Sequence, residues 1–137
     1  MPARSTDYWN PFLETLPRER LVKIELKNFH EVLRYAKGKS FLYHKKFEGI
    51  NPEDLKTVED IKRLPLTDKE DLRIAQERET PTIYGDILGV DPEAVSDFRQ
   101  TSGTTGKPVY VPETYESWQW RVEVWCHILW MAGFRET

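Results

Sequence analysis

The longest amphipathic pattern in the chain lies in its N-terminal third. Apolar residues recur there at spacings of four, three, four and three, at Val22, Leu26, Phe29, Leu33 and Ala36. Since an α-helix has 3.6 residues per turn, this spacing places them on one face of a helix of about five turns. Pro17 opens the pattern, and Gly38 follows it at the position where many helices need a glycine to end. We therefore expect a long helix that buries one stripe.

Shorter helices are expected next, because several start signals follow. Asn51 precedes a proline and two acids, which is typical of an N-cap and a first helical turn. Thr57 and Thr67 each stand three residues before an acid, as in a capping box. Residues 80–96 are rich in proline, glycine and acids and predict a long connection. Residues 1–79 are thus predicted to be mainly helical.

The pattern changes to an extended one around residues 97–112. Residues 97–100 and 109–111 form two short segments typical of strands, and residues 101–108 between them are rich in serine, threonine and glycine. This arrangement predicts a β-hairpin with an enlarged loop, and loops of this kind often carry function.

The last segment, residues 114–132, predicts a helix that is apolar on nearly every face. One stripe contains Trp118, Val122, Trp125, Leu129 and Ala132, and a second contains Trp120, Val124, Ile128 and Met131. A helix with this pattern is normally buried on most faces. We expect it to be covered by a missing domain or by self-association, so that the chain is either a truncation or forms an extensive interface with another chain.

Composition narrows the class of protein. Of the 137 residues, 39% are hydrophobic and 31% are charged. This balance is typical of a soluble globular domain. The net charge of −3 lacks the basic excess of most nucleic-acid-binding proteins. Cys126 is the single cysteine, so no intrachain disulfide can form. Without a signal peptide or a long apolar run, we expect a cytoplasmic protein with no membrane or nucleic-acid partner.

The loop at residues 101–108 carries the candidate chemistry. Its glycines let the main chain approach a ligand, and consecutive N–H groups in such a loop form a concave anion site. Hydroxyl groups add rotatable donors, and the lysine adds a positive charge. The candidate phosphate-binding residues are Thr101, Ser102, Gly103, Thr104, Thr105, Gly106 and Lys107.

This loop differs from the common nucleotide-binding P-loop. Only two residues separate Gly103 from Gly106, and Pro108 follows Lys107 where that motif needs a serine or threonine for Mg²⁺. The alternative is a flexible surface turn, since such turns use the same residue types. The fit of eight consecutive residues to one pattern favours the phosphate site.

These eight residues resemble the nucleotide-phosphate loop of the adenylate-forming, acyl-CoA synthetase-like superfamily. Three further segments are similar to the N-terminal part of phenylacetate–coenzyme A ligases, at residues 16–21, 41–47 and 61–73. The order of lysine before proline also favours that branch. The resemblance extends over residues 15–135.

The resemblance implies an ATP-dependent, AMP-forming ligase of phenylacetate catabolism. In that family a carboxylate is activated as an acyl-adenylate and then transferred to coenzyme A, and the loop holds the β- and γ-phosphates. Mg²⁺ is implied as a phosphate-bridging ion, although no metal ligand can be assigned. No catalytic residue is assigned in this chain, since the catalytic lysine, the aryl-acid pocket and the adenine contacts lie beyond residue 137. The fragment alone is expected to be inactive.

The implied fold is mixed α/β and represents an incomplete portion of the large adenylation domain, at residues 1–137. A mainly helical part (1–79) is followed by the connection, the β-hairpin carrying the phosphate loop and the buried apolar helix (80–137). The alternatives are an adenylating enzyme for another carboxylate or acceptor, and a non-catalytic helical interaction module with a vestigial loop.

Two other features have structural and functional interpretations. A basic cluster could contact coenzyme A phosphates or nucleic acid, but a solvated face is favoured. The tryptophans at 118–130 could line an aromatic-acid pocket, but packing is favoured. The basic cluster comprises Lys37, Lys39, His44, Lys45 and Lys46.

Overall fold

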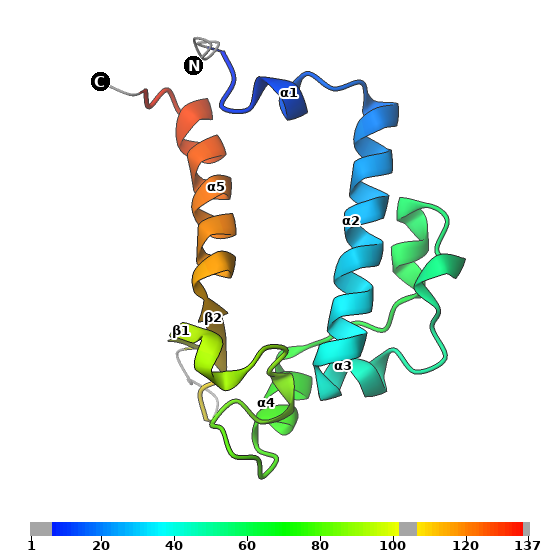
Figure 1. Ribbon diagram of the computed structural model, residues 1–137, viewed down its shortest axis with the longest axis vertical. Helices are drawn as coiled ribbons and strands as arrows, with labels where there is room; N and C mark the ends of the chain where they lie inside the picture. Colours follow the sequence, from blue (N-terminus) through cyan, green and yellow to red (C-terminus); the bar gives the residue numbers. More distant parts are fainter. Residues whose placement is uncertain (1–6, 102–106, 136–137) are drawn as a thin grey trace.

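Two long helices, α2 and α5, run along opposite sides of the molecule (Figure 1). The computed structural model describes residues 7–101 and 107–135. At one end, the two-stranded sheet lies at the foot of α5, α3 lies at the foot of α2 and α4 lies between them, and the N-terminal segment with α1 lies at the other end. In chain order the elements are α1 (Pro11–Glu14), α2 (Arg18–Lys39), α3 (Phe41–Lys46), η1 (Pro52–Asp54), η2 (Val58–Arg63), α4 (Lys69–Gln76), η3 (Gly85–Ile87), η4 (Pro92–Ala94), β1 (Val95–Gln100), β2 (Tyr110–Thr114) and α5 (Tyr115–Met131).

Helix α2 confirms the amphipathic pattern but ends differently from the prediction. It continues through Gly38 to Lys39, and Ser40 caps it with a backbone N–H that donates to the Ala36 carbonyl. Ser40 has extended backbone angles and is buried, and its hydroxyl donates to the Asp86 carbonyl at 3.1 Å. The chain therefore turns into α3 through this serine, and no left-handed glycine is needed.

The core lies between α2, α3 and the following turns. Leu33 of α2, Phe47 and Leu55 are buried together. Phe47 stacks on Tyr43 with ring centroids 5.4 Å apart. A stripe on α2 and two short segments thus form the main apolar cluster at one side of the molecule.

Two of the three predicted helix starts are confirmed, and the third is displaced. Asn51 caps η1 and Thr57 forms a capping box on η2. The cap of α4 is Asp68 rather than Thr67, and its box partner is Asp71. The two aspartates exchange bonds, since the Asp71 N–H donates to Asp68 at 2.9 Å and the Asp68 N–H donates to Asp71 at 3.0 Å. A carboxylate one residue later thus replaces the threonine hydroxyl.

The predicted hairpin is confirmed by strands β1 and β2, which pair antiparallel. Gln100 lies opposite Tyr110 at the end that carries the loop, and the register is irregular between Val95 and Asp97. The connection at residues 80–96 contains η3 and η4. Among the described residues, no helix combines the length and apolar character needed to cross a membrane.

Helix α5 has the predicted range, and the described residues of this chain do not bury it; they leave the exposed apolar surface expected if its cover is a missing domain or self-association. Trp120 is 74% exposed and Met131 is 78% exposed, and within α5 only Trp130 is buried in the structure described. The physical reason is that little is available to cover it. The sheet contacts its first turns, where Arg121 pairs with Glu113 of β2. The other faces have no comparable cover from residues 7–101 and 107–135.

The N-terminal segment packs against the far end of α5. Trp9 and Trp130 meet edge to face with ring centroids 5.6 Å apart. The Trp9 indole N–H donates to Glu123 at 2.7 Å, and His127 lies 3.3 Å from a carboxylate oxygen of Glu14. Arg135 lies over the Trp130 ring and donates to the Trp130 carbonyl at 2.7 Å. These contacts account for the one buried tryptophan of α5.

Candidate phosphate-loop site

Thr101 and Val109 hold the two ends of the 101–108 loop together. The Thr101 N–H donates to the Val109 carbonyl at 3.0 Å, and the Val109 N–H donates to the Thr101 hydroxyl at 3.1 Å. Val109 is 1% exposed, so this junction is fixed by packing as well as by hydrogen bonds. The Thr101 oxygen is used as an acceptor, and its proton can still be donated to an anion.

Gln76, the last residue of α4, holds the exit of the loop from the other side. Its side-chain oxygen accepts from the Tyr110 N–H at 2.7 Å, and its side-chain nitrogen donates to the Pro108 carbonyl at 3.4 Å. The residue was not predicted from the sequence. Nothing in the local pattern marks it, because its partners lie 32 and 34 positions away.

Gly85 fixes the position of Gln76 by close approach. Its φ is +55°, and an added Cβ would lie 2.3 Å from the Ala75 carbonyl oxygen and 2.6 Å from the Gln76 Cα. Only glycine tolerates both this backbone angle and this contact. Element η3 therefore packs directly on the last turn of α4.

Lys107 projects from the described end of the loop. Its side chain is 80% exposed, and its ammonium lies 3.7 Å from a Glu77 carboxylate oxygen. The same oxygen accepts from Arg73 at 2.8 Å. An exposed pair at this distance contributes little stability, so the Lys107 ammonium can leave Glu77 and pair with another anion at low cost in free energy.

Charge pairs also support α4. Arg73 binds both Glu77 and Glu70, and its hydrogen bond lowers the pKa of the Glu70 carboxyl. A hydrogen bond from Lys46 lowers the pKa of Asp71, the partner of the α4 cap, and the cap N–H adds to the effect. The first turn of the helix that holds the loop is thus stabilised by ionised carboxylates.

The structure places two of the seven predicted phosphate-binding residues. Thr101 and Lys107 flank the loop as described above. Ser102, Gly103, Thr104, Thr105 and Gly106 lie outside the described residues. Within the described ranges, no group of three or more His, Cys, Asp or Glu side chains could hold a metal ion, so Mg²⁺ gains no ligand here.

Most of the basic cluster at residues 37–46 has structural partners, which favours the solvated-face interpretation. Lys37 donates to the Ile50 carbonyl, and Lys46 pairs with Asp71. Lys45 lies over the Phe41 ring, 5.7 Å from its centroid. His44 contacts the Lys37 carbonyl at 3.1 Å. These contacts tie α3 to its neighbours and need no external phosphate.

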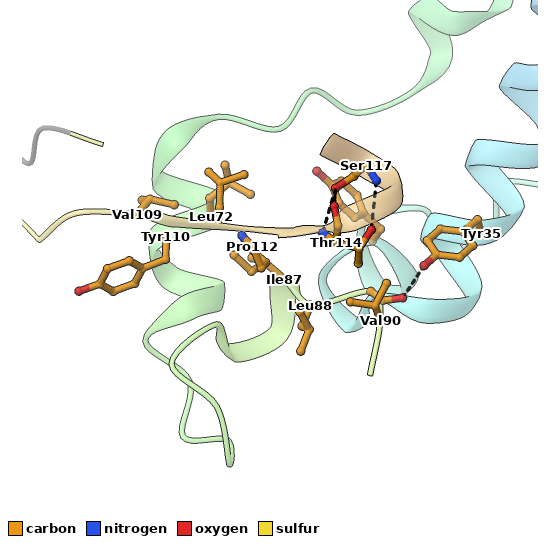
Figure 2. A pocket seen from close by; sticks show the side chains of 13 residues that line it. Tyr35, Leu72, Ile87, Leu88, Val90, Val109, Tyr110, Pro112, Thr114 and Ser117 are labelled. Atoms are coloured by element: carbon orange, nitrogen blue, oxygen red, sulfur yellow. Dashed lines mark hydrogen bonds between the residues drawn. The ribbon is translucent and has the colours of Figure 1, made fainter. Parts of the chain in front are cut away.

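A cavity of about 430 Å³ lies beside β2 (Figure 2). Side chains from α2, α4, η3, β2 and the start of α5 line it, and Figure 2 shows them around the strand. Three of its polar side chains are internally bonded: Tyr35 donates to the Gly89 carbonyl at 2.9 Å, and Thr114 and Ser117 bond each other. None of its described lining residues is charged. The cavity therefore suits apolar groups and not phosphate.

The comparisons with curated proteins agree on one enzyme. Phenylacetate–coenzyme A ligase of Thermus thermophilus is 32% identical over 129 residues, 93% of this chain and 27% of the relative. The Escherichia coli enzyme is 28% identical and the Pseudomonas putida enzyme 30%, each over 85% of this chain and 25% of the relative. No family model matches the chain. The chain thus spans about a quarter of the length of these relatives.

Solved structures extend the similarity to the fold. A 2-hydroxyisobutyryl-CoA ligase in complex with 2-HIB-AMP matches 98% of this chain and 28% of its own, with a TM-score of 0.84 and 31% identity. The same ligase with 2-HIB-AMP and CoA in the thioesterification state gives 0.85 and 33%. In sequence and in fold, this chain therefore resembles the N-terminal part of phenylacetate–coenzyme A ligases, within the acyl-CoA ligases.

Proposed function

We propose that this chain forms the phosphate-binding part of an ATP-dependent, AMP-forming acyl-CoA ligase. The observation that carries the proposal is the 101–108 motif, which stands at the end of a hairpin held by α4. Its setting is a fold similar to ligases solved with an acyl-adenylate and CoA. The candidate ligand is the triphosphate of ATP.

In this function the chain would act by positioning and by charge. A carboxylate attacks the α-phosphorus of ATP, the acyl-adenylate forms and pyrophosphate leaves, after which the thiol of coenzyme A displaces AMP. The Thr101 hydroxyl and the Lys107 ammonium would hold the β- and γ-phosphates during the first step. Mg²⁺ carried by the ATP phosphates would neutralise charge, with no ligand assigned from the described residues.

The proposed acid is phenylacetate, by analogy with the curated relatives. The solved structures are of a 2-hydroxyisobutyryl-CoA ligase, and their sequence identity to this chain is nearly the same as that of the curated relatives. A different carboxylate is therefore the second candidate. The loop is proposed to contact only the phosphates of ATP, so it does not distinguish the two carboxylic acids. We propose that the groups that select the acid and complete catalysis lie in segments corresponding to the rest of the relatives, and that the chain alone is inactive.

Phosphate binding is tested with Lys107→Ala and with the matched control Lys62→Ala, another exposed lysine. ATP is titrated into the 137-residue chain by calorimetry. Losing a charge-assisted hydrogen bond is expected to weaken binding about tenfold in Lys107→Ala, with no change in the control. Equal affinity in the two variants would remove Lys107 from the site. A wild-type chain with no affinity for ATP would favour the interaction-module alternative.

Activity is tested by pyrophosphate exchange into ATP with a panel of aryl and hydroxy acids. The assay compares the chain alone with the chain joined to segments corresponding to the remaining length of the relatives. Exchange is expected only in the joined form and to be greatest with phenylacetate. Greater exchange with 2-hydroxyisobutyrate would replace the proposed acid without affecting the phosphate site.

A further inference from the structure

We infer that Gln76 is a positioning residue, whose carboxamide fixes the exit of the 101–108 loop and thereby the place of Lys107. The inference rests on the proposed phosphate function and adds to it a residue outside the motif. Gln76 itself is not expected to touch the nucleotide, since both of its side-chain groups are bonded to the main chain.

The geometry suits an amide at this position. The Tyr110 N–H can only donate and the Pro108 carbonyl can only accept, so the side chain between them must present an acceptor to one and a donor to the other. Among uncharged side chains, a carboxamide offers both functions on one planar group. The same two partners fix which end of the Gln76 amide is oxygen.

The clamp acts on three consecutive residues from two sides. Gln76 binds the residues before and after Val109, and Thr101 binds both main-chain groups of Val109. Their main-chain positions at the exit are therefore set by α4 on one side and by the loop entrance on the other. Lys107 is joined directly to Pro108, whose ring restricts the backbone, so the direction in which Lys107 leaves follows from this clamp.

Gln76 is rigid enough for this task. It lies half-buried at the end of α4, where the preceding Ala75 is buried and Gly85 approaches its Cα closely. Its two hydrogen bonds hold the carboxamide in one orientation. The conformational entropy of the Gln76 side chain is thus lost when the chain folds and not when a ligand binds.

The test uses the 137-residue chain and inorganic tripolyphosphate, which reports phosphate binding without the adenosine. Gln76→Met keeps the length and removes both hydrogen bonds, and Gln119→Met on exposed α5 is the control. We expect tripolyphosphate affinity to fall about fivefold to thirtyfold in Gln76→Met, the range for one or two lost hydrogen bonds, and to be unchanged in the control. Unchanged affinity in Gln76→Met would overturn the inference.

A double variant separates positioning from general stability. If Gln76 acts through Lys107, adding Gln76→Met to Lys107→Ala costs little further affinity, because the positioned group is already absent. Fully additive losses would show that Gln76 does not act through Lys107 and would overturn the inference.

Amide hydrogen exchange provides the second readout and separates the two proposals. The Tyr110 amide is expected to lose protection in Gln76→Met and to keep it in Gln119→Met, while amides of α2 are unaffected. If wild type binds no tripolyphosphate, the proposed function fails and so does the ligand-positioning role. Retained Tyr110 protection in Gln76→Met would also overturn the clamp itself, whereas its loss would support the clamp.

Discussion

The exit of the 101–108 loop and helix α5 are stabilised in opposite ways. Around the exit of the 101–108 loop, η3 packs closely on the end of α4, and the Gln76 side chain of α4 forms hydrogen bonds with the main chain at the start of β2. Along α5, large apolar side chains such as Trp120 and Met131 face away from the rest of the described chain. The chain itself supplies the loop support, whereas its described residues leave α5 exposed, and we propose that other protein surface covers it.

The comparison is tested most severely at Gly85. Gly85→Ala forces a Cβ against the Ala75 carbonyl at a positive φ, and we expect it to lower the free energy of unfolding by about 3 kcal/mol or more. Gly49→Ala is the matched control, because its φ is +74° and no atom lies within 4 Å of the added Cβ. It is expected to cost about 1–2 kcal/mol, from backbone strain alone. Equal losses in urea denaturation would contradict the close contact.

The next effect concerns the two kinds of tryptophan on α5. Trp130 is 8% exposed and packs on Trp9. Trp130→Ala is therefore expected to cost about 2–3 kcal/mol of stability in urea denaturation. Trp120 is mostly exposed. Trp120→Ala should therefore change stability by at most about 0.5 kcal/mol, as for other surface substitutions.

The effect of substitution on self-association is expected to be greater at Trp120 than at Trp130, the reverse of the order for stability. If the bare faces of α5 drive association, Trp120→Ala shifts the chain toward monomer in sedimentation velocity. A monomeric wild-type chain, or association unchanged in Trp120→Ala, would contradict the interpretation that α5 requires cover through this face.

The smallest effect is expected at Glu77, beside the clamp. Glu77→Gln removes the carboxylate that competes with phosphate for Lys107, and we expect tripolyphosphate to bind about twofold to threefold more tightly, as for an exposed ion pair. Glu79→Gln, an exposed acid nearby in the sequence, is the control. Similar gains in both variants would attribute the effect to net charge rather than to the Glu77–Lys107 pair.

Much of the local structure could be predicted from patterns spanning a few residues. Helical and strand periodicity and local capping bonds explain these correct predictions. They are the α2 stripe, the caps at Asn51 and Thr57, the hairpin and the range of α5. The errors were also local. Ser40 rather than a glycine ends α2, through its backbone N–H bond to Ala36, and Asp68 rather than Thr67 caps α4, through its reciprocal bonds with Asp71.

The candidate site divides in a similar way. The sequence by itself determined the motif at 101–108 and its resemblance to a ligase phosphate loop. Glycines, hydroxyl side chains and a lysine within one short segment indicate an anion site without knowledge of the fold. Only the tertiary structure revealed Gln76 and Gly85 as its support, because their partners are distant in sequence or are main-chain atoms that no composition reveals. The sequence likewise determined that α5 is apolar, but its exposure depends on which surfaces are present to cover it, and that is a property of the assembled structure.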